Sequence, residues 1–237
     1  MKFNLAHPDR QTIKSFFNAI PSRYDFLNSF FSLGLDRYWR RRLVTSALGK
    51  MHSRDISILD VGVGTGKSLA EFLKNGPFKC SIGCDFSENM LHKSKERFGD
   101  LVHLLAGDFH ELPFASGSFD LVTGSFVLRS VQSMRDFLTE IKRVTRPGGK
   151  TVFLELTRPQ NKLIWNFAYR PYLNFYIPIV GKVFSKHDQA YQFLSQSIQS
   201  FVDPVDLKKD FESAGFSEVS YEPLSFGSST IIQGRKS

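Results

Sequence analysis

Hydrophobic residues in this chain gather in short runs that are separated by segments with a helical pattern. Short apolar runs bounded by turn residues are typical of strands that are buried on both faces. The sequence predicts such a strand at each of five places: residues 58–61, 80–84, 101–105, 119–123 and 151–156.

The segments between these runs favour helices at residues 68–73, 87–98 and 137–144. In the second of these, Ser87 is the expected N-cap. The positions along one side of this helix are Met90, Leu91, Ser94 and Phe98. Strands that alternate with helices predict a mostly parallel sheet that is covered on both faces.

The carboxyl-terminal part departs from this alternation. A helix near residues 205–214 ends at Gly215, and two strand-like runs follow at 216–221 and 229–233. Such a pair is expected to close the sheet as an antiparallel hairpin. We therefore expect one α/β domain whose parts are a helical cap (1–52), a core (53–158), a helical lid insertion (159–200) and a closing helix with hairpin (201–237).

The glycine-rich turn after the first predicted strand is the strongest chemical signal. Glycines at 62, 64 and 66 permit positive φ angles and the close approach of a ligand. A P-loop would require glycine where Val61 stands, and the dinucleotide fingerprint would require a small residue in place of Lys67. The pattern GxGxG fits an adenosyl ligand without a pyrophosphate, although by itself it could be only a tight turn.

Asp85 favours the nucleoside interpretation of this turn. It stands at the end of the next predicted strand, nineteen residues beyond Gly66. A carboxylate at that place can accept hydrogen bonds from both ribose hydroxyls.

Composition narrows the remaining classes of function. The chain has 237 residues, 41% of them hydrophobic, and a formal charge of +8. The clearest basic cluster, residues 37–42, has no zinc-finger, RRM or helix-turn-helix pattern beside it, so a nucleic-acid partner is not expected. The first residues lack the apolar region of a signal peptide, which predicts a cytoplasmic protein.

The two cysteines predict neither a disulfide nor a metal site. Cys80 and Cys84 lie about 13 Å apart if they share one strand, which is too far for a disulfide. No histidine falls at ligand spacing with them. We expect buried thiols and no metal.

Two longer motifs carry a resemblance to a known family. Residues 23–28 (RYDFLN), with Ser32, Gly34 and Trp39 beyond them, form the first motif, and residues 143–157 (RVTRPGGKTVFLELT) form the second. The chain resembles a class I S-adenosylmethionine (SAM) methyltransferase, and more narrowly the ubiquinone/menaquinone biosynthesis C-methyltransferase family. The resemblance spans nearly the whole length and implies a Rossmann-like, mostly parallel seven-stranded sheet.

The resemblance also implies a set of SAM-binding residues. The glycine turn with Thr65 would hold the methionine half of SAM, Asp85 the ribose, and Asp108 with Phe109 the adenine. Asp108 could instead be a turn residue. Ser125 follows the fourth predicted strand, at the edge where open α/β sheets bind ligands. The full set is Gly62, Gly64, Thr65, Gly66, Asp85, Asp108, Phe109 and Ser125.

The catalytic expectation centres on Arg129. The family carries Phe-Gly-Leu-Arg-Asn after the fourth strand, and this chain reads FVLRS at 126–130. Arg129 is expected to stabilise the phenolate of a quinol acceptor, since an arginine does not readily accept a proton. A salt bridge to a helix is the structural alternative. Val127 and Ser130 depart from the family and leave the substrate open.

Three further side chains are candidates for the reaction. Tyr24 is expected to close over SAM or the quinol ring, or else to belong to the core. Histidine is a common general base, which makes His110 and His187 candidates, but neither matches a family motif, so both are expected to be surface residues.

Residues 163–178 form an aromatic stretch whose Asn166, Arg170 and Asn174 argue against a membrane span. We expect a lid that accepts a polyprenyl tail and, with Arg170 and the arginines at 40–42, contacts an anionic bilayer; a packing element or a homodimer contact is the alternative. The sequence thus predicts SAM-dependent C-methylation of a polyprenylated quinol, demethylmenaquinol before a benzoquinol. Another small-molecule acceptor, or a silent SAM-binding protein, stays open.

Overall fold

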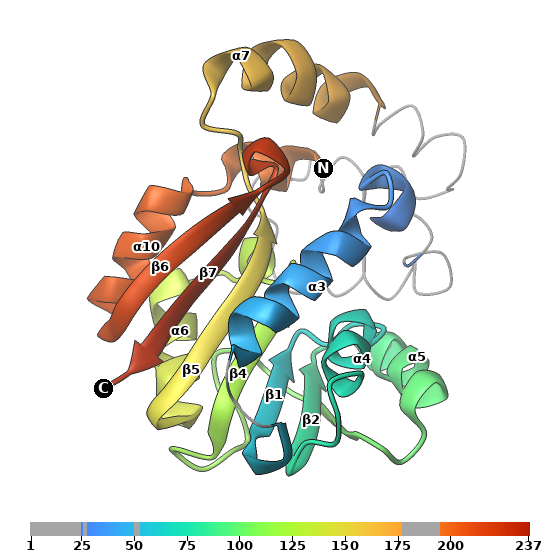
Figure 1. Cartoon of the computed structure of the whole chain (residues 1–237), viewed down its shortest axis with the longest axis vertical. Helices are drawn as coiled ribbons and strands as arrows, with labels where there is room; N and C mark the ends of the chain where they lie inside the picture. The colour runs from blue at the N-terminus through green and yellow to red at the C-terminus, as the bar shows by residue number, and fades with distance from the viewer. Residues whose placement is uncertain (1–24, 26–27, 50–52, 177–194) are drawn as a thin grey trace, which may run out of the picture.

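The structure, a computed structural model, describes residues 25, 28–49, 53–176 and 195–237. A seven-stranded sheet with the order β3-β2-β1-β4-β5-β7-β6 runs through the molecule (Figure 1). Strands β1 to β5 pair in parallel, and β7 is antiparallel to both β5 and β6. The predicted mostly parallel sheet with a closing hairpin is confirmed. The strands are β1 (Ser57–Val61), β2 (Cys80–Asp85), β3 (His103–Ala106), β4 (Phe119–Ser125), β5 (Thr145–Leu156), β6 (Phe216–Leu224) and β7 (Ser229–Lys236).

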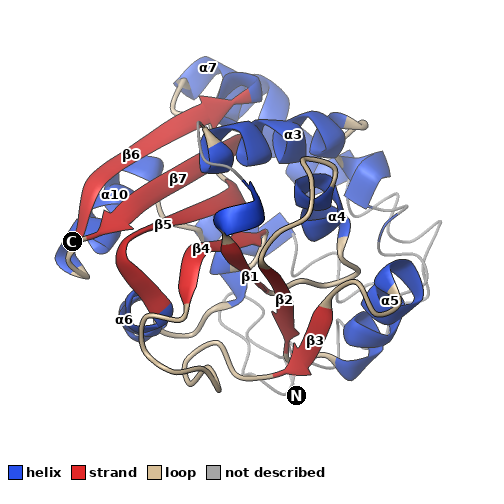
Figure 2. Cartoon of the chain, turned by 60° about the horizontal axis from the view of Figure 1, so that its bottom comes forward, coloured by secondary structure: helices blue, strands red, loops and turns tan. Residues whose placement is uncertain are grey.

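Helices cover both faces of this sheet (Figure 2). On one face α6 (Met134–Val144) and α10 (Pro204–Ser213) pack in a core that includes Leu59 and Phe153. On the other face lie α3 (Leu35–Leu48), α4 (Lys67–Leu73) and the end of α5 (Glu88–Phe98). Short 3₁₀ turns complete this part: η1 (Ser53–Asp55), η2 (Leu128–Ser130) and η5 (Ser225–Gly227).

The predicted periodicities produce these elements for local reasons. Helix α5 begins where Ser87 Oγ accepts a hydrogen bond from the Met90 N–H, so the expected N-cap is confirmed. Helix α6 is capped in the same way by Ser133. Every residue of β1 is buried, as expected for a central parallel strand with helices on both faces.

One strand prediction was wrong in its burial. The run 101–105 was expected to be buried, but β3 starts at His103, and Leu101 is 80% exposed. The reason is its place in the sheet: β3 is an edge strand that pairs only with β2. Apolar runs at sheet edges have the same composition as central ones, and only the strand order separates them.

The strand order places the site. From β1 the chain moves outward to β2 and β3, and it then returns to β4 on the other side of β1. Open α/β sheets bind ligands at such a switch point, beyond the carboxyl ends of the strands. The segments after β1 and β4 touch there, because a Cβ on Gly62 would lie 2.7 Å from Val127 Cγ2.

The segment from Lys162 to Tyr176 lies across one end of the sheet, at the top of Figure 1. It consists of α7 (Lys162–Ile164) and two π-helical stretches, η3 (Trp165–Tyr169) and η4 (Tyr172–Tyr176). We call residues 162–176 the lid helix. The carboxyl ends of β4 and β5 face this end of the molecule.

Candidate active site

The glycine turn between β1 and α4 has the backbone that its sequence demands. Gly62, Gly64 and Gly66 have φ angles of 70°, 55° and 83°. A Cβ at Gly66 would lie 2.3 Å from the Phe98 ring, so this glycine also permits α5 to pack closely. Gly64 is different, since the nearest atom to its Cβ would be 3.9 Å away. There the glycine leaves open space in front of the turn.

Asp85 holds this turn directly. One of its carboxyl oxygens accepts a hydrogen bond from Gly64 N at 2.8 Å, and the other accepts from Ser87 N at 2.9 Å. Burial raises the pKa of Asp85 to about 6, and the backbone donors at Ser87 and Gly64 oppose that rise. The carboxylate is therefore at the predicted place, and it braces the turn in addition to facing the switch point.

Asp60 was missed by the sequence analysis. It is only 1% exposed near the carboxyl end of β1, and neither carboxyl oxygen accepts a hydrogen bond of ordinary geometry from the described part of the chain. Burial raises its pKa to about 7 and the charge of Asp85 adds to that rise, while Arg40 and a weak contact with the Leu69 backbone favour the charged form. An aspartate inside an otherwise apolar strand run was the available signal, because a buried carboxyl group is costly unless it has a partner.

Asp108 and Phe109 follow β3 and lie in different environments. The Asp108 carboxylate accepts a hydrogen bond from His110 N at 3.0 Å and lies 3.2 Å from His110 Nδ1. Phe109 is 5% exposed and packs edge-to-face on Phe86 at 5.4 Å between ring centroids. Together they form the wall of the switch point on the β2 and β3 side.

Ser125 ends β4 and joins a chain of polar side chains on the opposite wall. Ser68 Oγ donates to Ser125 Oγ at 2.8 Å, and Arg40 donates to Ser68 Oγ. The next residue, Phe126, has a φ of 61°, an uncommon angle for a residue with a side chain. Its ring lies 5.1 Å from the Arg40 guanidinium carbon. Strained backbone of this kind clusters at functional sites.

Arg129 is paired and buried. Its side chain is 7% exposed, and Nε donates to Glu155 Oε1 at 2.6 Å, whose own side chain has no exposure. Nη1 donates to Ser197 Oγ at 2.8 Å. The alternative in the sequence analysis was a salt bridge to a helix; the structure shows a salt bridge, but its partner Glu155 lies on strand β5. Any action of Arg129 on a substrate would start from this paired state.

Two of the other candidates lie outside the described residues, namely Tyr24 and His187. His110 is described, and its contact with Asp108 sets it beside a proposed adenine-binding residue. The structure therefore places a histidine near the site that the motifs alone did not assign.

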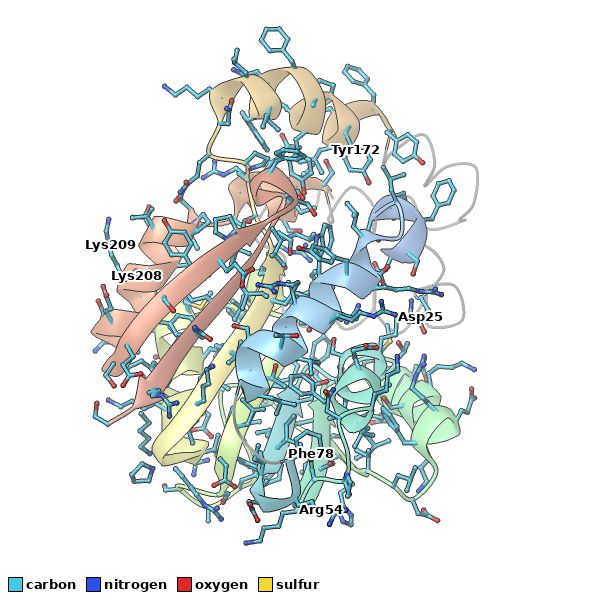
Figure 3. All side chains as sticks on the ribbon, viewed as in Figure 1. Asp25, Arg54, Phe78, Tyr172, Lys208 and Lys209 are labelled. Carbon is cyan, nitrogen blue, oxygen red and sulfur yellow. The ribbon has the colours of Figure 1, made fainter. Side chains whose placement is uncertain are left out.

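The lid helix turns most of its aromatic residues inward. Trp165, Tyr169, Tyr172 and Tyr176 form a continuous series with centroid distances of 6.0, 6.0 and 5.1 Å. The Tyr172 hydroxyl donates to the Phe31 carbonyl, and Figure 3 shows Tyr172 on the underside of the lid helix. Burial raises the pKa of the Tyr169 hydroxyl.

The outer face of the lid helix is apolar in part. Leu163, Phe167 and Phe175 are 68%, 80% and 67% exposed. The arginines at 40–42, by contrast, do not present one basic surface. Arg40 is 8% exposed, and Arg42 donates to Glu222. The expected basic cluster is therefore divided between the interior and a surface ion pair.

The residues that the structure describes form neither a metal site nor a membrane span. No group of three His, Cys, Asp or Glu side chains there is placed to hold a metal ion. None of the helices formed by those residues combines the length and apolar character needed to cross a bilayer. Both cysteines are free; Cys84 is buried as expected, whereas Cys80 is partly exposed, so the expectation of a buried thiol was wrong there.

The sheet order, the glycine turn after β1 and the acidic residue that ends β2 define a class I SAM-dependent methyltransferase. A family profile described as "ubiE/COQ5 methyltransferase family" matches residues 6–236, and the chain belongs to that family.

Three relatives support this assignment over nearly the whole length. A demethylmenaquinone methyltransferase of Mycobacterium marinum is 37% identical and covers 96% of this chain and 95% of its own. One of Corynebacterium efficiens is 35% identical, covering 91% and 90%. A ubiquinone/menaquinone biosynthesis C-methyltransferase UbiE of Desulfotalea psychrophila is 34% identical, covering 94% and 90%.

Solved structures agree on the fold. The CurJ carbon methyltransferase superposes with a TM-score of 0.66 at 19% identity, over 89% of this chain and 58% of that one. A SAM-dependent methyltransferase of Thermotoga maritima, described as a possible histamine N-methyltransferase, has a TM-score of 0.59 at 20% identity, over 91% and 98%. Identities of this size carry the fold alone.

Proposed function

We propose that this chain transfers the methyl group of SAM to a ring carbon of a polyprenylated quinol, with demethylmenaquinol as the first candidate and the ubiquinone-pathway benzoquinol as the second. The observation that carries the proposal is similarity over more than nine-tenths of the chain to relatives named for demethylmenaquinone methylation. The acceptor is thus a quinone precursor. Demethylmenaquinol is the first candidate because most of those relatives are named for demethylmenaquinone.

The residues at the switch point fit SAM. The unpartnered oxygens of Asp60 are suited to the α-ammonium group of a bound amino acid moiety. We assign the open space before Gly64 to the methionine half of SAM, together with Gly62, Thr65 and Gly66. Asp85 would accept from the ribose hydroxyls, Asp108 with Phe109 would bind the adenine, and Ser125 would line the opposite wall.

When bound, SAM supplies an electrophilic methyl group with its positive charge already in place. The task of the protein is then to hold the acceptor carbon in line with that methyl group. A quinol carbon becomes nucleophilic when a neighbouring hydroxyl loses its proton, and a phenol of pKa about 10 needs help near neutral pH. We assign stabilisation of the phenolate to Arg129, and closure over the rings to Tyr24.

The pairing of Arg129 limits how it can act. Glu155 neutralises much of its charge, and both groups are buried. Arg129 Nη1 also donates to Ser197, which belongs to a helical turn at residues 195–200. In the same turn Ser195 Oγ donates to the Leu173 carbonyl of the lid helix. Arg129 therefore joins the ends of β4 and β5 to this turn and, through it, to the lid helix. Positioning of the acceptor pocket is therefore the alternative role, and the kinetic test in the Discussion separates the two.

We also propose that the enzyme works at the cytoplasmic surface of an anionic membrane. The exposed Leu163, Phe167 and Phe175 lie on a segment, residues 156–176, that carries three basic side chains and no aspartate or glutamate. Such a surface suits the interface between lipid headgroups and acyl chains, where a polyprenyl tail would emerge. A homodimer contact through the same face is the competing outcome of the membrane test below.

The experiment is an assay of the purified chain with SAM and short-chain demethylmenaquinol, in which the methylated naphthoquinol is detected by mass spectrometry. The matched variants are Gly64→Ala and Gly99→Ala. Both glycines have a φ of 55° and room for a methyl group, so each change places a side chain at a positive φ, and only Gly64 lies in the turn after β1. We expect Gly64→Ala to weaken SAM binding and Gly99→Ala to leave it unchanged. Absence of any methylated quinol with wild-type protein that binds SAM would refute the proposed acceptor.

A second candidate is methylation of another small molecule, and one observation favours it. Val127 stands where the family segment has glycine, and its side chain fills the space against Gly62 at the switch point. A panel of demethylated benzoquinols and simple phenols in the same assay tests this. Turnover on a phenol but not on demethylmenaquinol would favour the second candidate.

A further inference from the structure

A carboxylate outside the β-sheet, that of Asp25, also holds the glycine turn. Asp25 Oδ1 accepts a hydrogen bond from Thr65 Oγ1 at 2.5 Å, and Oδ2 accepts from Arg97 Nη2 at 2.8 Å. Arg97 Nε also donates to the Thr65 carbonyl at 2.7 Å. Asp25 lies beside α4 and the beginning of α3 in Figure 3. It therefore connects the start of the described chain, the glycine turn and α5.

Lys67 adds a second set of contacts to the same place. Its Nζ donates to the Asp25 carbonyl at 2.9 Å and to Ser29 Oγ at 3.1 Å, and it lies 3.8 Å from Asp36 Oδ2. Burial lowers the pKa of Lys67, while Asp25 and Asp36 favour its charged form. The residues on both sides of Gly66 are thus tied to residues from the amino-terminal side of α3.

We infer that Asp25 is a positioning residue for SAM binding, which fixes the glycine turn through Thr65 and ties it to α5 through Arg97. The turn is then held at Gly64 N by Asp85 and at Thr65 by Asp25. Two sites that stabilise the same conformation strengthen each other. SAM stabilises the conformation of the turn in which these hydrogen bonds form, so loss of the bonds lowers the affinity for SAM. This inference rests on the proposal that residues 62–66 hold SAM.

The test compares Asp25→Asn and Arg97→Gln with wild type by calorimetry. We expect Kd for SAM to rise roughly 5- to 150-fold in Asp25→Asn, the usual range for coupling between two sites. The KM for SAM should rise while kcat at saturating SAM stays near wild type, because the contacts of Asp25 are with Thr65, Lys67 and Arg97. The control is Asp206→Asn, an exposed carboxylate that lies 2.7 Å from Lys209 on α10, remote from the turn.

A second readout separates positioning from general loss of stability. Hydrogen exchange of the peptide that covers residues 62–68 should be faster in Asp25→Asn without SAM, while exchange of β5 and β7 is unchanged. Arg97→Gln should also speed hydrogen exchange at residues 62–68. This variant tests the same contacts if Asp25→Asn does not fold. If Asp25→Asn and Arg97→Gln bind SAM as wild type does while Gly64→Ala binds it more weakly, the inferred role of Asp25 is overturned and SAM binding at residues 62–66 is retained. If all three variants bind SAM as wild type does, both proposals are overturned.

Discussion

Replacement of Arg129 by alanine should destabilise the protein strongly. The change leaves Glu155, which has no exposed side-chain surface, without the guanidinium that lies 2.6 Å from it. Removal of one partner from a buried ion pair costs about 3–5 kcal/mol, because the other charge remains buried. For a chain of this size, 1 kcal/mol lowers Tm by about 2–4 °C. We therefore expect Tm to fall by roughly 6–20 °C.

The assay is thermal and urea unfolding of Arg129→Ala, Glu155→Gln and the double variant Arg129→Met/Glu155→Leu. The double variant should recover most of the loss, because apolar side chains of similar volume need no partner. The matched control is Lys209→Met, which removes an ion pair of similar length, 2.7 Å, between exposed side chains. That change should alter the free energy of unfolding by less than about 1 kcal/mol.

Two results would refute this reasoning. One is an Arg129→Ala variant whose free energy of unfolding stays within about 1 kcal/mol of wild type, the size expected for a surface pair. The other is a double variant no more stable than the single one. Kinetics of the folded variant then decide the role of Arg129. A lower kcat with unchanged SAM affinity supports stabilisation of the phenolate. A higher KM for the quinol with unchanged kcat supports positioning through Ser197.

Four further outcomes are expected. Asp85→Asn should weaken SAM binding by about 1.5–3 kcal/mol in calorimetry, because the amide places an N–H group against a backbone donor of the turn or the ribose; wild-type affinity would remove Asp85 from the site. Asp60 has a pKa raised to about 7, so its proton must leave before it can pair with a cation. SAM affinity should therefore rise with pH, by at most about tenfold per pH unit below that pKa, and then level off; Asp60→Asn should remove the part of this rise near pH 7 and leave the rise due to Asp85, whose pKa is about 6, and a pH profile unchanged from wild type would contradict the assignment. The same raised pKa affects the free energy of unfolding without SAM, because the folded state binds the Asp60 proton more tightly than the unfolded state does. The protein should therefore become less stable as pH rises from the unfolded pKa of Asp60 to about 7. Finally, the double variant Phe167→Ser/Phe175→Ser should float less with anionic liposomes at low salt than wild type does. If flotation is unchanged and sedimentation shows that a wild-type dimer is lost in the variant, the lid helix is a subunit contact instead.

The sequence determined the elements and the class of site because these depend on neighbouring residues. The spacing of the glycines predicted the turn after β1, because glycine adopts positive φ angles whatever residues surround it. Ser87 fixed the start of α5 in the same local way. A run that is apolar except for Asp60 identified β1, and the alternation of strands and helices was enough for a parallel sheet.

The tertiary structure decided which side chains meet. Glu155 and Ser197 lie 26 and 68 positions from Arg129, and Asp25 lies 40 from Thr65; no local pattern specifies such pairs. The exposure of β3 depends on its place at the sheet edge. Asp60 became a candidate only once its burial without a partner was visible. Periodicity records which face of an element is buried, whereas the partner of a charged group and the cost of its burial depend on residues that folding brings together from distant parts of the chain.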